Sequence, residues 1–283
     1  MRVVSWNMKC RGPEAAKRQG SLLHRLAPDL MLLQELNPGS SKVLEDAAGA
    51  DWMVRSIDLL TSQPDDPPVH RLGVGIAGRG PPPRRSWLLD GIHLRERILF
   101  IETEMKGAPF IAASYHAPPG VNHGIVKPRQ AVAFAFWLST QNGPLLFGAD
   151  ANTPLIDAPD FVKTRTHWHT GRLRLLGEPG DDLLFGPGKV HDLEDALRRW
   201  LVVHPDEMDR LRAIRPCGPL AVTHRTGRRK SSEGTGRRYD SVWISHHWVV
   251  RHVEHLYEEG IAAGSDHAPV LVDLDWPALP EIG

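Results

Sequence analysis

Apolar and polar positions divide the first part of the chain into a strand, a helix and a second strand. A β-rich run over residues 3–7 ends at Asn7. Residues 14–26 carry leucines at helical spacing and predict a helix. Residues 30–34 form a short apolar run typical of a buried strand, and this run ends at Glu35.

The rest of the chain contains more strands than helices. Helices are predicted over residues 128–138 and 191–200, a turn over 37–39, and irregular chain over 160–189. The predicted strands cover residues 72–77, 98–104, 110–115, 145–147, 220–223, 239–245, 249–254 and 269–274. The chain shows no internal repeat and no linker. We therefore expect a single domain over residues 1–283, with two packed sheets flanked by helices.

Composition restricts the possible fold and function of the chain only broadly. Charged residues make up 24% and apolar residues 41% of the 283, and 34 basic side chains balance 34 acidic ones. Global charge therefore gives no evidence of a nucleic-acid partner. Cys10 and Cys217 are too few for a disulfide framework. Charges after Trp6 interrupt any signal sequence, and no apolar run could span a membrane. We expect a cytoplasmic monomer without stable membrane association.

Polar groups stand where the predicted strands end or begin. Each has an ordinary explanation when taken alone, as a turn former, a cap or an exposed strand end. Loops at sheet ends are also where rigid scaffolds hold catalytic groups. The groups are Asn7, Glu35, His116, Asp150 with Asn152, His224, Asp240, and Asp266-His267 before the last strand.

Taken together, these residue types suit phosphodiester hydrolysis. Mg²⁺ prefers oxygen ligands and takes few carboxylates, which Glu35, Asp266 and the Asn7 amide can supply. Asp150 can orient or deprotonate water, and Asn152 can bind a phosphate oxygen. Asp240 beside His267 would fix the imidazole tautomer and raise its pKa. His116 can donate a proton to the phosphate or its leaving group.

Five motifs stand in the order typical of one family. They are Ser5-Trp6-Asn7, Leu33-Gln34-Glu35, Gly148-Ala149-Asp150-Ala151-Asn152, Arg238-Tyr239-Asp240-Ser241-Val242-Trp243-Ile244 and Ser265-Asp266-His267-Ala268-Pro269-Val270. Over nearly its whole length the chain resembles the endonuclease/exonuclease/phosphatase (DNase I-like) superfamily.

The resemblance implies a four-layer αββα sandwich whose two central sheets are mainly antiparallel. It implies Mg²⁺ or Mn²⁺ at Glu35, with Asn7 and Asp266 nearby. It also implies that Asp150 and Asn152 handle water and phosphate, and that Asp240 supports His267.

Three positions depart from the family pattern. An extra alanine precedes Asp150 and a small residue replaces the usual aromatic after it, but the Asp-x-Asn core is intact. Family members carry Tyr or His at the position of Tyr115 and His116. We assign the catalytic role to His116, which precedes Ala117-Pro118, and a substrate-binding role to Tyr115. Tyr239 replaces the usual Ile or Leu, which should alter packing and not chemistry.

A basic segment between two strands bears on the substrate. Its six positive side chains favour an extended polyanion, although a solvated hairpin tip would have the same composition. They are Arg225, Arg228, Arg229, Lys230, Arg237 and Arg238. Arg84-Arg85-Ser86-Trp87 offers a second basic and aromatic contact. His167-Trp168-His169 lacks a third ligand, so we assign no metal to it.

The main hypothesis is a metal-dependent nuclease that cleaves DNA, or RNA, by direct attack of water on phosphorus. The first alternative is a phosphodiesterase or phosphatase acting on a small or lipid-borne phosphoester, such as an inositol phosphate or a sphingomyelin-like lipid. The second is a non-catalytic nucleic-acid-binding protein with a relic site.

Overall fold

The computed structural model describes residues 1–9, 12–60, 72–119, 123–166, 180–226 and 235–276. Their strands form two six-stranded sheets and one two-stranded hairpin. In spatial order, the first sheet contains β13 (Val249–His255), β14 (Val270–Asp275), β1 (Arg2–Asn7), β2 (Leu30–Leu36), β4 (Gly73–Gly78) and β3 (Trp52–Arg55). The second contains β5 (Arg85–Leu88), β6 (Ile98–Met105), β7 (Ala108–His116), β8 (Leu145–Asp150), β12 (Asp240–Ile244) and β9 (Glu194–Asp195). The hairpin contains β10 (His224–Thr226) and β11 (Thr235–Arg237).

Each large sheet contains one parallel pair of strands at its centre. These pairs are β1–β2 and β7–β8, and all other pairings in the two sheets are antiparallel. The prediction of mainly antiparallel sheets is therefore confirmed. Parallel neighbours end at the same edge of a sheet, so side chains that follow β1 and β2 are brought together, as are those that follow β7 and β8.

The two sheets pack face to face through their inward-facing side chains. Val3 and Leu32 of the first sheet share a core cluster with Ile101 and Leu146 of the second. The residue after Val3, Val4, faces the other side and packs under the helices that cover the first sheet. Both faces of the central strands are buried, which explains why β1 and β2 read as continuous apolar runs.

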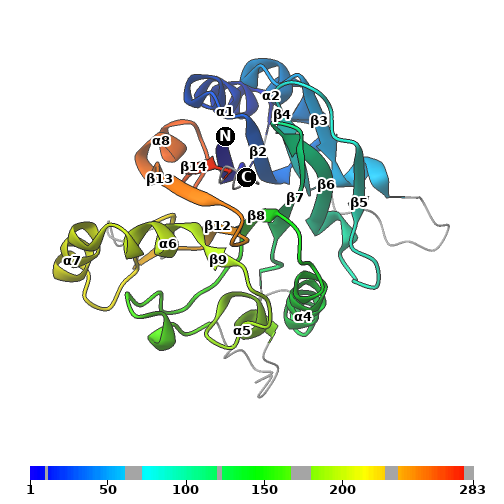
Figure 1. Ribbon diagram of the computed structural model, residues 1–283. Helices are drawn as coiled ribbons and strands as arrows, with labels where there is room; N and C mark the ends of the chain where they lie inside the picture. Colours follow the sequence, from blue (N-terminus) through cyan, green and yellow to red (C-terminus); the bar gives the residue numbers. More distant parts are fainter. Residues whose placement is uncertain (10–11, 61–71, 120–122, 167–179, 227–234, 277–283) are drawn as a thin grey trace, which may run out of the picture.

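Helices cover the outer faces of the sheets (Figure 1). The helices are α1 (Pro13–Leu26), α2 (Pro38–Ala48), α4 (Val126–Ser139), α5 (Gly180–Phe185), α6 (Ala196–Val202), α7 (Pro205–Ile214) and α8 (Tyr257–Ala262), with short 3₁₀ turns at Ser56–Leu59, Arg95–Arg97 and Phe161–Lys163. Helices α1 and α2 pack on the first sheet, and α4 and α5 pack on the second. Helix α6 joins the core between β12 and β13. The four-layer αββα sandwich predicted from the sequence is confirmed.

Three local predictions were wrong because capping or long-range pairing overrode the sequence pattern. The expected turn at 37–39 begins α2: the Asn37 side chain accepts a hydrogen bond from the Gly39 amide at 2.9 Å, and Pro38 is the first helical residue. The helix expected from residue 191 begins only at Ala196, because Asp195 caps it and pairs with β12. Residues 220–223 form no strand, and β10 begins at His224.

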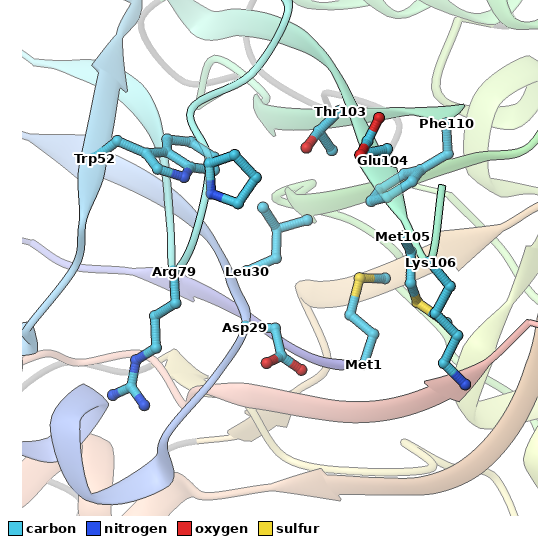
Figure 2. A pocket seen from close by; sticks show the side chains of 11 residues that line it. Met1, Asp29, Leu30, Trp52, Arg79, Thr103, Glu104, Met105, Lys106 and Phe110 are labelled. Atoms are coloured by element: carbon cyan, nitrogen blue, oxygen red, sulfur yellow. The ribbon is translucent and has the colours of Figure 1, made fainter. Parts of the chain in front are cut away.

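A cavity of about 320 Å³ lies at the end of the sandwich where β1 and β2 begin (Figure 2). Met1, Leu30, Trp52, Arg79 and Phe110 are among the residues that line it. The polar strand ends lie at the opposite end of the same strands, so this cavity is separate from the candidate site. Among the described residues, no helix combines the length and apolar character that crossing a membrane requires.

Candidate active site

The strand registers bring the polar residues of both sheets to one end of the sandwich. In the second sheet, Asp150 at the end of β8 pairs with His116 at the end of β7 and with Asp240 at the start of β12. In the first sheet, Asn7 pairs with Gln34, the residue before Glu35. Antiparallel pairing explains why Asp240, which begins its strand, meets residues that end theirs.

A hydrogen bond between the sheets joins these two groups. The amide nitrogen of Asn7 donates to Asp150 Oδ2 at 2.7 Å, and both side chains are buried. The other oxygen of Asp150 accepts from the backbone amide of Asn152 at 3.1 Å. Asn152 adopts a left-handed backbone (φ +48°), and its side chain donates to the Ala117 carbonyl at 3.1 Å. Asp150 is therefore held from both sides before any substrate binds.

His267 and Asp240 form a buried imidazole–carboxylate pair. Nδ1 of His267 lies 2.8 Å from Asp240 Oδ2, and Nε2 lies 4.0 Å from Asp150 Oδ2. Burial opposes the charged imidazole, but Asp240 and Asp150 outweigh it and raise the pKa of His267 to about 10. The ring is fixed by its own backbone: its amide donates to Ser265 Oγ at 3.0 Å, and its carbonyl accepts from Trp6 Nε1 at 2.9 Å. His267 is therefore a cation whose Nε2–H points into the site.

Glu35 stands at an irregularity of β2. Its backbone is left-handed (φ +52°), and the pairing of β2 with β4 shifts register between Leu33 and Leu36. Such a bulge re-aims a side chain at the edge of a sheet. Burial, and then the charge of Asp150, raise the pKa of Glu35. Negative charge therefore accumulates between Glu35 and Asp150.

His116 faces this negative charge as a neutral ring. Its Nε2 lies 3.6 Å from Glu35 Oε1 and 3.5 Å from Asp150 Oδ2, while Arg97 Nη1 lies 2.8 Å from Nδ1. Burial and the Arg97 guanidinium hold the pKa of His116 well below its usual value. Because Arg97 can only donate, Nδ1 accepts and the proton resides on Nε2. Sequence reasoning missed Arg97, which lies in a 3₁₀ turn 19 residues from its partner.

Tyr115 corrects one prediction. Successive residues of a strand face opposite sides of the sheet, so Tyr115 points away from His116. Its ring is fully buried in the aromatic core, 5.1 Å from Phe134 and 6.1 Å from Phe185 between ring centroids. The choice of His116 agrees with this geometry, and the substrate-binding role assigned to Tyr115 does not.

The structure describes only part of the basic segment. Arg228, Arg229 and Lys230 lie outside the described residues, as do His167 and His169. Arg225 and Arg237 lie on the hairpin β10–β11, whose first residue, His224, forms a β-bridge with His267.

Arg238, in contrast, is buried in an ion-pair network. Its Nε and Nη2 donate to Asp157 at 2.6 and 3.0 Å, and its Nη1 donates to Asp195 at 2.7 Å. Arg198 donates to the same Asp157 at 2.5 Å. With these donors satisfied internally, Arg238 holds the loop after β8 against β12 and is not placed to bind substrate.

Asp266 differs from Glu35 and Asp150 because a lysine contacts it directly. The Lys9 ammonium group donates to Asp266 Oδ2, and His224 Nε2 lies 3.8 Å from the same oxygen. Although burial disfavours its charged form, the nearby His224 and Lys9 side chains hold the pKa of Asp266 well below its usual range. Sequence reasoning did not find Lys9, and it noted His224 only as a strand end.

The donor set at Glu35 and Asp150 fits a hard divalent cation. A partly buried carboxylate, Glu35, and a fully buried one, Asp150, both have raised pKa values and share incompletely compensated negative charge, and hard divalent ions bind through oxygen. Two further groups have ligand atoms within 4.8 Å of one another: His224, Asp266 and His267, and Asp150, Asp240 and His267. We assign no ion to either, because His267 Nδ1 is engaged by Asp240 and Asp266 by Lys9.

The predicted ligands Asn7 and Asp266 are not free in this arrangement. Asn7 offers its amide nitrogen to Asp150, and its oxygen accepts from the Lys9 backbone amide at 3.0 Å. Asn7 therefore positions the carboxylate of Asp150 and does not present an oxygen toward it.

Comparisons with known proteins place this site in a family. The model of the endonuclease/exonuclease/phosphatase family matches residues 4–267, and the chain belongs to this family. No curated protein sequence matches the chain. Family membership supports a hydrolase of the nuclease or phosphodiesterase type.

Solved structures share the fold at low sequence identity. A Danio rerio TDP2 complexed with a single-strand DNA product aligns with a TM-score of 0.64 and 14% identity over 97% of this chain and 98% of that one. A humanized D. rerio TDP2 carrying 14 mutations gives a TM-score of 0.63, again with 14% identity over 97% and 98%. The endonuclease domain of TRAS1, a telomere-specific non-LTR retrotransposon, gives 0.56 with 14% identity over 98% and 99%.

Proposed function

We propose that the chain is a divalent-metal-dependent phosphodiester hydrolase whose substrate is nucleic acid, DNA or RNA. One observation carries the proposal: the Nε2 atoms of His116 and His267 lie 3.5 and 4.0 Å from the same carboxylate oxygen, Asp150 Oδ2. A base between two hydrogen-bond donors is what the attack of water on a phosphate requires.

Asp150 is the group that orients and deprotonates the attacking water. Its raised pKa makes it a stronger base than an ordinary aspartate, and Asn7 and Asn152 hold its two oxygens in place. The new bond forms between the water oxygen and phosphorus, the ester P–O bond breaks, and no covalent enzyme intermediate is needed.

The two histidines act on the phosphate as donors. His267 is protonated at neutral pH, and Asp240 occupies its Nδ1, so Nε2–H is the atom available to a phosphate oxygen. His116 Nε2–H is the donor for the phosphate or its leaving oxygen, and Asn152 binds a phosphate oxygen. Glu35 would hold Mg²⁺ or Mn²⁺, which would supply positive charge against the negative charge that develops on the phosphate.

A nucleic-acid substrate is supported by the position of β10–β11. Arg225 and Arg237 lie on this hairpin beside His224 and His267. Each basic side chain that neutralises a backbone phosphate strengthens binding in a salt-dependent way. A fold neighbour, the D. rerio TDP2, was solved with a single-strand DNA product.

The test is cleavage of labelled double-stranded DNA, single-stranded DNA and RNA with Mg²⁺, Mn²⁺ or EDTA. His267→Gln is the site variant, and His252→Gln, on half-exposed β13 surface, is the control. We expect metal-dependent cleavage that His267→Gln abolishes and His252→Gln leaves unchanged. If the folded protein cleaves none of these polymers but hydrolyses bis-p-nitrophenyl phosphate or an inositol phosphate, the substrate of the site is a small phosphoester and not a nucleic acid.

A further inference from the structure

Lys9 is the residue of this site whose position the proposed chemistry does not explain. It follows β1, and its backbone is left-handed (φ +40°), a conformation that costs a non-glycine residue roughly 1 kcal/mol. Its amide donates to the side-chain oxygen of Asn7 at 3.0 Å, which holds the turn. Lys9 therefore adopts an unfavourable backbone conformation at the position where its side chain lies beside the site.

The ammonium group of Lys9 lies directly on the Asp266 carboxylate. The partner is fixed independently: Ser265, the residue before Asp266, donates to the Asn7 carbonyl at 2.7 Å. The Lys9 and Asp266 side chains are 31% and 37% exposed, so the ion pair lies at the mouth of the site. Within the described part of the chain, the ammonium group donates to Asp266.

The turn at Lys9 also makes the side-chain oxygen of Asn7 unavailable as a metal ligand. Because the oxygen of Asn7 accepts from Lys9, Asn7 presents its amide nitrogen to Asp150. Glu35 and Asp150 are left with shared negative charge, while Asp266 already has a cation. The site thus contains two places where carboxylates could hold a cation, one at Glu35 and Asp150 and one at Asp266. At Asp266, the ammonium group of Lys9 already supplies the positive charge.

We propose that the Lys9 ammonium group occupies the cation position at Asp266. The protein then binds a single divalent ion, at Glu35. Lys9 lies where a two-ion site would hold its second metal ion. Two-ion phosphodiesterases use paired cations to stabilise the attacking and leaving oxygens. Here a fixed ammonium group supplies the second charge. The inference rests on the proposed function, because it concerns the ions of the same site.

The experiment counts bound ions without relying on turnover. Mn²⁺ binding is measured by calorimetry and by the electron paramagnetic resonance of free Mn²⁺. The proteins are the wild type, Lys9→Met, Lys9→Arg, and Lys42→Met as the control. Lys42 is an exposed lysine that also pairs with an aspartate, Asp46 at 2.7 Å, but on α2. Thermal melting verifies that each variant is folded.

We expect one ion in the wild type, in Lys9→Arg and in Lys42→Met, and two in Lys9→Met. Adding Asp266→Asn to Lys9→Met should return the count to one, and Asp266→Asn alone should leave it at one. Two ions in the wild type, one ion in Lys9→Met, or loss of the single ion in Asp266→Asn would overturn the role of Lys9. A wild type that binds no ion would instead refute the proposed metal-dependent function.

Discussion

Replacing Arg238 by methionine should destabilise the protein strongly without acting on substrate binding. Arg238 is only 6% exposed, and its side chain makes two hydrogen bonds to Asp157 and one to Asp195. Methionine fills a similar volume but leaves both carboxylates buried beside an apolar group. Breaking one side of a buried ion pair costs about 3–5 kcal/mol. Arg198 still contacts Asp157, so we expect the lower part of this range.

The assay is urea denaturation at neutral pH, compared with Arg237→Met. Arg237 is the adjacent residue, but it is partly exposed, and it donates only to the Leu155 carbonyl among the contacts recorded for the described chain. Its loss should change the unfolding free energy by about 1 kcal/mol or less and should weaken nucleic-acid binding with a reduced salt dependence. If Arg238→Met left the unfolding free energy unchanged and weakened binding instead, the structural role assigned to Arg238 would be refuted.

Three further outcomes are expected. Asp240→Asn should lower kcat roughly 10²–10⁴-fold, because the imidazolium loses its carboxylate partner; a loss below tenfold would contradict the role of the pair. Burial lowers the pKa of His191 to about 4, against about 6.5 in the unfolded chain. The unfolded chain therefore takes up a proton at His191 before the folded protein does. The contribution of His191 to the unfolding free energy is complete above pH 6.5 and falls by up to about 3 kcal/mol as the pH drops to 4. His191→Gln should flatten the urea-denaturation pH profile in that window, and an unchanged slope would exclude His191 as its source. Phe147→Ala should lower the unfolding free energy by about 3–5 kcal/mol, because the buried ring of Phe147 packs on Trp243 and Phe134. Phe136 is 54% exposed, so Phe136→Ala should change stability little. Calorimetric melting curves compare the two variants.

Local patterns predicted the sheets and the strand ends well. Residues 3–7 and 30–35 are apolar runs that stop at a polar residue, and a buried strand explains both features. The family motifs then indicated which of these polar residues would belong to one site. The alternation of side chains along β7 also required Tyr115 and His116 to face opposite ways, but not which of them would enter the core. Only the packing of α4 against that sheet decides it.

The remaining features depend on partners far away in the sequence. Arg238 reads as one member of a basic run, and its acid partner Asp157 lies 81 residues earlier in a region with no regular pattern. Lys9 is likewise 257 residues from Asp266. Charge composition cannot distinguish such a pair from two solvated side chains, because nothing local marks the contact. The caps at Asn37 and Asp195 were short-range signals that the pattern contained and that our interpretation missed.

The position of β1 constrains when this protein can become active during its synthesis. β1 lies between β2 and β14, and β14 follows all the other described strands in the sequence. Ser265 and His267, which hold the end of β1, immediately precede β14. A chain still growing on the ribosome therefore carries Asn7, Glu35 and Asp150 without the imidazole that completes them. The imidazole–carboxylate pair of the site therefore forms only after the residues up to His267 have left the ribosome.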